Sequence, residues 1–121
     1  MSRFIDDGNG TIADTETGLM WQKERAPETY TWQDALKYCE GLDLAGHSDW
    51  RLPNVRELQS IVDYGRWNPA IDPVFGAVSS WYWSSSADVY NPDVAWLVNF
   101  SDGNVADDGK AHDNYVRAVR G

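Results

Sequence analysis

The stretch SDWRLPNVRELQSIV, residues 48–62, decides how this chain folds. Asn54, followed three residues later by Glu57, matches the capping box, in which each side chain accepts a hydrogen bond from the other residue's backbone N–H. Pro53 lies just before this cap, where it interrupts no helical hydrogen bond. The apolar residues that follow recur at helical spacing: Val55, Leu58, Ile61 and Val62. We therefore predict a helix that begins after Asn54.

A second helix is predicted upstream, with Thr31 as its N-cap and Gly41 near its end. Its apolar residues share one face: Trp32, Ala35, Leu36, Cys39 and Leu42. Nearer the N-terminus, the turn signal Asn9-Gly10 separates two short apolar segments and indicates a hairpin. Residues 19–22 are expected to add a further strand.

Strands are predicted downstream of the decisive stretch. Pro69, Pro73 and Gly76 favour an irregular connection over residues 67–78. Alternating residues then indicate strands at 81–84 and 94–100, with Trp96 as a fixed core residue of the latter. Asp102-Gly103 predicts a turn, and residues 115–120 a last strand. Helices grouped between mostly antiparallel strands indicate an α+β fold.

Composition limits the kinds of partner. The chain has 121 residues, the size of one domain spanning 1–121, with a net charge of -9. That charge disfavours nucleic acid and anionic membrane surfaces. No apolar run is long enough for a membrane helix, and the start lacks the apolar run of a secretory signal. Cys39 is the one cysteine, so no intrachain disulfide forms.

Four phrases in the sequence together resemble one family. They are Asp14-Thr15-Glu16-Thr17-Gly18-Leu19-Met20-Trp21-Gln22, Ser48-Asp49-Trp50-Arg51-Leu52-Pro53-Asn54, Tyr82-Trp83-Ser84-Ser85-Ser86 and Tyr115-Val116-Arg117-Ala118-Val119-Arg120-Gly121. In this order they look like the Lcl C-terminal domain, found at the tips of bacterial collagen-like adhesins. The resemblance implies a C-type lectin-like fold, in which two helices pack on small antiparallel sheets and the N- and C-terminal strands pair. It also implies an extracellular or cell-surface location.

The resemblance further implies a ligand surface in the C-terminal half. Some relatives are variable proteins of diversity-generating retroelements, in which randomised asparagine codons cannot encode Gln, Glu, Lys, Met or Trp. Between Ser84 and Tyr115 the chain has no Glu, Gln or Met, and Trp96 and Lys110 are the exceptions. Mixtures of Asp, Asn, Tyr and Ser suit an adaptable binding surface, and equally suit ordinary solvated loops.

The candidate ligand-binding residues therefore come from this third of the chain. They are Trp81, Tyr82, Ser86, Asp88, Tyr90, Asn91, Asp93, Asn104, Asp107, Asp108, His112 and Asn114. Among them, Trp81, Tyr82 and Tyr90 are the candidates for an aromatic platform that stacks on a sugar or anchors a protein. Trp21, Trp32, Trp50 and Trp83 are expected in the core instead.

Catalysis and metal binding are the chemical alternatives. His47, His112 and Cys39 are few candidates for a nucleophile and its base, and Cys39 lies on an apolar helix face. The formylglycine-generating enzymes, which share the broader fold, use a cysteine pair that this chain lacks. The Glu-Pro-Asn and Trp-Asn-Asp calcium motifs of many lectins are also missing. Four aspartates remain as a weaker calcium candidate: Asp102, Asp107, Asp108 and Asp113.

We accordingly expect a calcium-independent, nonenzymatic module that binds a protein or a glycan, as a monomer or small homo-oligomer. The rival interpretation is a structural cap or oligomerisation domain of a surface fibre. The sequence identifies no ligand, since a surface built to vary has no diagnostic chemistry.

Overall fold

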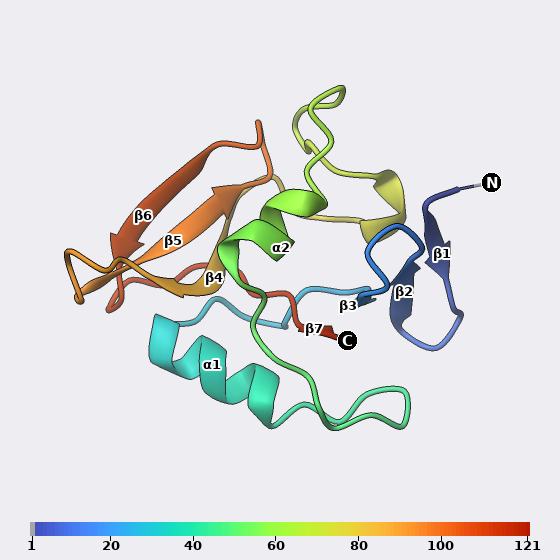
Figure 1. Cartoon of the computed structure of the whole chain (residues 1–121), viewed down its shortest axis with the longest axis horizontal. Helices are drawn as coiled ribbons and strands as arrows, with labels where there is room; N and C mark the ends of the chain where they lie inside the picture. The colour runs from blue at the N-terminus through green and yellow to red at the C-terminus, as the bar shows by residue number, and fades with distance from the viewer. Residues whose placement is uncertain (1) are drawn as a thin grey trace.

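Two antiparallel sheets and two α-helices make up the structure, a computed structural model that describes residues 2–121 (Figure 1). The elements, in chain order, are β1 (Phe4–Asp6), β2 (Thr11–Asp14), β3 (Met20–Gln22), α1 (Trp32–Glu40), α2 (Val55–Ser60), the 3-10 helix η1 (Pro73–Phe75), β4 (Trp81–Ala87), β5 (Val94–Asn99), β6 (Val105–Gly109) and β7 (Val119–Arg120). This arrangement confirms the predicted α+β class and agrees with a C-type lectin-like fold.

The first sheet has the strand order β1-β2-β3-β7 and joins the two ends of the chain. The predicted Asn9-Gly10 hairpin forms between β1 and β2, where Ile5 pairs with Ala13. The C-terminal strand β7 pairs with β3, Trp21 opposite Val119, and β1 lies at the far edge. The expected pairing of terminal strands therefore involves the third strand of the chain rather than the first.

Both helices begin as their caps predict. The Thr31 side chain accepts from the backbone N–H of Asp34, and α1 ends at Gly41. Asn54 and Glu57 form the reciprocal capping box of α2. Arg51, just before that cap, makes two backbone hydrogen bonds of 2.9 Å with Val119. The start of α2 is thereby fixed to the C-terminal strand.

The second sheet, in the order β4-β5-β6, has a helix on each face. Leu58 of α2 belongs to one core cluster with Tyr82 and Val98. Cys39 of α1 belongs to a second cluster with Trp83 and other residues of the opposite face. Successive strand residues point to opposite faces, so the sheet separates the two clusters. Figure 1 shows α2 in front of this sheet and α1 below it.

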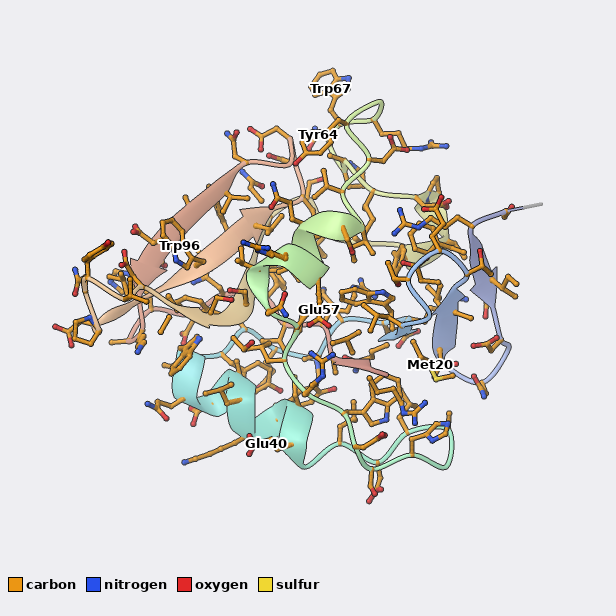
Figure 2. All side chains as sticks on the ribbon, in the orientation of Figure 1. Met20, Glu40, Glu57, Tyr64, Trp67 and Trp96 are labelled. Atoms are coloured by element: carbon orange, nitrogen blue, oxygen red, sulfur yellow. The ribbon has the colours of Figure 1, made fainter. Side chains whose placement is uncertain are left out.

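The structure corrects the prediction that Trp96 is a core residue. Helix α2 packs over Val98 but does not extend over Trp96, which lies on the same face of β5. Trp96 is therefore only half-buried (Figure 2). Trp32, also expected in the core, is half-buried as well, whereas Trp21, Trp50 and Trp83 are buried as predicted. The sequence analysis also missed β6, and of the strand predicted over 115–120 only β7 forms as a strand.

Candidate functional site

The loop between β4 and β5 carries the most exposed apolar side chains of the described residues 2–121. Val89 is 87% exposed and Tyr90 is 95% exposed. Large apolar side chains standing this far into solvent gain nothing from folding, and Tyr is one of the residues enriched at protein interfaces. The end of this hairpin is therefore a candidate binding surface.

Side-chain hydrogen bonds hold the backbone of this loop in one conformation. The Asp88 carboxylate accepts from Tyr90 N at 2.8 Å, and the Asn91 side-chain oxygen accepts from Asp93 N at 3.2 Å. Backbone bonds close the loop, with Asp88 N donating to Val94 O at 3.1 Å. Asp and Asn favour such local turns because their short side chains reach the backbone two residues ahead. The two exposed side chains thus stand on a fixed loop.

The segment after β6 lies beside this loop. Lys110 N donates to Asp93 O at 2.9 Å, which ties residues 109–114 to the β4–β5 hairpin. We call residues 88–93 and 108–114 together the tip surface. It contains the aspartates Asp88, Asp93, Asp108 and Asp113 against one lysine, so it is acidic as well as partly apolar.

Asp108 organises the second half of the tip surface. Its carboxylate bonds His112 Nδ1 at 2.6 Å and accepts from Asn114 Nδ2 at 3.0 Å and Gly109 N at 2.8 Å. Partial burial would raise the pKa of Asp108, but the hydrogen bonds from Asn114, His112 and Gly109 outweigh it and lower that pKa. The carboxylate therefore stays ionised and holds His112 at the surface, 71% of its side chain exposed.

The start of α1 supports the tip surface from below. Trp32 N donates to Lys110 O at 3.0 Å, and the Lys110 ammonium lies 4.2 Å from the centre of the Trp32 ring. Tyr30 and Asn114 exchange two backbone hydrogen bonds of 2.9 Å. Trp32 packs against the second core cluster and its ring also contacts the Lys110 ammonium, so it lies half-buried at the edge of the core.

The structure brings together seven of the predicted ligand-binding residues, which all belong to the tip surface: Asp88, Tyr90, Asn91, Asp93, Asp108, His112 and Asn114. Asp107 is exposed on β6 and pairs with Trp96 across the sheet. It therefore lies on the uncovered part of the α2 face. The Ser86 hydroxyl accepts from Val55 N at 3.0 Å and so serves the first turn of α2.

The remaining three predicted residues lie at the other end of the sheet. Trp81 pairs with Asn99. In the β5–β6 turn, the carbonyl oxygen of Asn104 accepts a hydrogen bond from Asn99 N at 2.8 Å. Tyr82 is only 1% exposed, because its ring packs edge-on against Phe100 at 5.2 Å inside the core. This placement corrects the expected platform of Trp81, Tyr82 and Tyr90. Neighbouring strand residues face opposite sides, and Tyr90 lies a strand length away.

Sequence reasoning missed Val89 and Lys110 as members of the tip surface. An apolar Val-Tyr pair inside an Asp/Asn/Pro turn was the available signal for Val89. No local signal marked Lys110, whose place depends on Trp32, 78 positions earlier in the chain. A second exposed aromatic pair, Tyr64 (68%) and Trp67 (80%), lies on the loop after α2 (Figure 2).

The titratable groups within residues 2–121 do not gather as a metal centre would need. No three His, Cys, Asp or Glu side chains of that range are placed to hold one ion together. The four aspartates considered for calcium are thus not assembled around a common point. Burial raises the pKa of the Cys39 thiol to about 12, which keeps it protonated. No helix in the same range is long and apolar enough to cross a membrane.

The fold and this surface define a class of protein: a small α+β domain whose second sheet presents fixed, exposed loops at one end. Residues 10–120 match the Lcl C-terminal domain family, and the chain belongs to that family. The comparison with curated proteins gave no match. The resemblance carried by the four sequence phrases is confirmed by the family match over nearly the whole chain.

Proposed function

We propose that this domain is a ligand-recognition module and that the tip surface contacts the ligand. The observation that carries the proposal is the near-complete exposure of Val89 and Tyr90 on a loop whose backbone is already fixed. A loop ordered before binding loses little conformational entropy when a partner docks. Tyr adds rigid contact area with a hydroxyl at its end.

A protein is the ligand that these features favour. Val89 offers apolar area without hydrogen-bonding groups, which suits a protein pocket better than a sugar ring. The surrounding aspartates suit a partner that presents Lys or Arg, and they disfavour acidic polysaccharides. Binding through these groups requires neither a metal ion nor a chemical step, so the proposed function is recognition without catalysis.

Alanine substitution of Tyr90 tests the proposal. The domain is first used to capture partners from arrays of proteins and of neutral and acidic glycans, and the affinity of each partner is then measured. Tyr90→Ala should weaken binding at least about tenfold, equivalent to about 1.4 kcal/mol. Tyr64→Ala removes another exposed tyrosine, 68% exposed, from a distant loop and is the matched control. Equal affinities of the two variants would place the site elsewhere, and capture by glycans alone would overturn the protein assignment.

We further propose that part of the tip surface is diversified by a retroelement. Val89, Tyr90 and His112 project from backbone that other residues hold, so their replacement leaves the loop intact. Lys110 and Trp96, which randomised asparagine codons cannot produce, have support roles on Trp32 and β5. An adjacent reverse transcriptase gene and a near-copy of the 3′ end that differs at adenines would support diversification. Their absence from the genome would contradict it.

The alternative function is a structural cap or oligomerisation domain. The exposed pair Tyr64 and Trp67, at the opposite end of the sheet from the tip surface, favours self-association there. Sedimentation velocity distinguishes the two functions, because a stable trimer that Trp67→Ala converts to monomer would favour the structural role. A monomer at every concentration would favour independent recognition.

A further inference from the structure

A cavity in the described part of the chain lies far from the tip surface, lined by residues of the first sheet, α1 and η1. Its volume is about 810 Å³, within the range of small-molecule sites. Its apolar wall includes Pro27, Val74 and Phe75, and its polar wall includes Lys23, Arg25 and Tyr38. The proposed recognition function uses none of these residues.

A buried cation lies directly behind the cavity wall. Arg117 is 2% exposed, and its guanidinium donates to the carbonyl oxygens of Gln22 at 2.7 Å, Lys23, and Phe75 at 3.4 Å. All three acceptor residues line the cavity. No carboxylate among residues 2–121 forms an ion pair with Arg117. A desolvated charge without a counter-charge makes the space beside it electrostatically positive.

A hydrogen-bond chain prepares Tyr38 to donate into the cavity. Gln22 accepts from Ala118 N at 3.0 Å through its side-chain oxygen, which leaves its amide nitrogen to donate to the Tyr38 hydroxyl at 2.8 Å. The Tyr38 oxygen is thereby used as an acceptor. Its own O–H has no acceptor among the described residues, and it is free to donate to a ligand.

The charged residues of the wall complete the balance. Lys23 pairs with Asp6 at 2.6 Å, so these two largely neutralise each other. Arg25 donates one N–H to the carbonyl oxygen of Ala26 at 3.1 Å, and its guanidinium lies 5.0 Å from the centre of the Tyr115 ring. Its other N–H groups form no hydrogen bond with the described residues. Glu24 is a second exposed acid of this wall, beside Asp6. The cations at this cavity are Lys23, Arg25 and Arg117, and the carboxylates are Asp6 and Glu24. The cavity thus has a net positive charge in a protein whose net charge is -9.

We propose that this cavity binds a small molecule that carries a carboxylate on an apolar body. The carboxylate accepts from the Tyr38 hydroxyl and the Arg25 guanidinium, in the positive field of Arg117. The apolar body packs against Val74, Phe75 and Pro27. Arg and a directed O–H are the donors that recognise carboxylates in proteins.

Titration of the whole chain with phenylacetate, followed by amide nitrogen–proton NMR spectra, tests the proposal. Phenylacetamide has the same shape without the charge and is the matched probe. Phenylacetate should shift the amides of residues 22–25 and 74–76 saturably, and phenylacetamide at least about tenfold more weakly. Saturation at millimolar probe suffices, because so small a ligand has few atoms to contribute.

Variants assign the donors. Tyr38→Phe keeps the ring and removes the O–H, and Arg25→Gln removes the charge of a half-buried side chain. Each variant should weaken phenylacetate binding at least about fivefold. Arg66→Gln makes the same charge change on a distant loop and should leave binding unaltered, as should Tyr90→Ala. The proposal is overturned if the cavity amides do not shift, if the amide probe binds as well, or if Arg25→Gln and Arg66→Gln behave alike. None of these results bears on the tip surface, so the two proposals fail separately.

Discussion

Replacing Glu57 with alanine removes two connections at the start of α2. Its carboxylate accepts from Arg51 at 2.6 and 2.7 Å and from the backbone N–H of Asn54 at 3.0 Å. The Glu57 side chain is 18% exposed and the Arg51 side chain 40%, so water screens the pair only partly. The cap bond is worth about 1 kcal/mol and the bidentate pair about another 1 kcal/mol. We therefore expect Glu57→Ala to lower the free energy of unfolding by about 2 kcal/mol.

Urea denaturation followed by tryptophan fluorescence measures this change, and a thermal melt should show Tm lowered by about 5–10 °C. Glu40→Ala is the matched control (Figure 2), because Glu40 is exposed near the C-terminal end of α1 and makes no side-chain hydrogen bond among the described residues. Its removal should change stability by less than about 0.5 kcal/mol. Glu57→Gln, which keeps an acceptor for Asn54 but loses the charge, should fall between wild type and Glu57→Ala.

The same variant has a predicted pH dependence. Hydrogen bonds from Arg51 lower the pKa of Glu57 below its ordinary value of 4.5. A lowered folded-state pKa means that the contribution is complete above about pH 4.5 and is lost as the pH falls through the folded-state value. The stability gap between wild type and Glu57→Ala should therefore narrow in acid. A gap below about 0.5 kcal/mol at pH 7, or one that widens in acid, would refute the reasoning.

The other predictions concern the core and the lone thiol. Leu58→Ala should lower the free energy of unfolding, measured by urea denaturation, by about 2–5 kcal/mol, because Leu58 is fully buried. Val89→Ala should change it by less than about 0.5 kcal/mol, because Val89 is exposed. Similar losses for the two variants would show that Val89 is packed in solution. Cys39, with its pKa raised to about 12, should react with a thiol reagent at pH 8 only after urea unfolds the chain. Rapid reaction of the native protein would contradict its burial.

The helix starts were predictable because their determinants are local. Asn54 and Glu57 are three residues apart, and Thr31 caps the residue three positions ahead, so neither depends on distant parts of the chain. The hairpin at Asn9-Gly10 was predictable for the same reason. The family phrases added the overall class. Most of the candidate surface was also predicted, because the β4–β5 hairpin places its turn residues at one end of the sheet.

Strand β6 was not predictable from its own residues. Val105–Gly109 contains two aspartates and a glycine, types that are depleted in strands. It is a strand because β5 supplies backbone partners along its whole length, from Val94 opposite Gly109 to Val98 opposite Val105. Backbone pairing with β5 thus outweighs the low strand propensity of the β6 residues.

By itself, the sequence determined where the helices begin, which turns close the hairpins and which family the chain belongs to, since these follow from contacts between residues close in the chain or from shared phrases. Only the tertiary structure decided which side chains reach solvent. Trp96 is only half-buried because the six-residue α2 does not extend over it, and Tyr82 is buried because Phe100 packs against it. Likewise, Arg117 is buried behind a cavity because residues 95, 94 and 42 positions away supply its hydrogen-bond acceptors. Burial depends on what packs from elsewhere in the chain, and no local pattern records it.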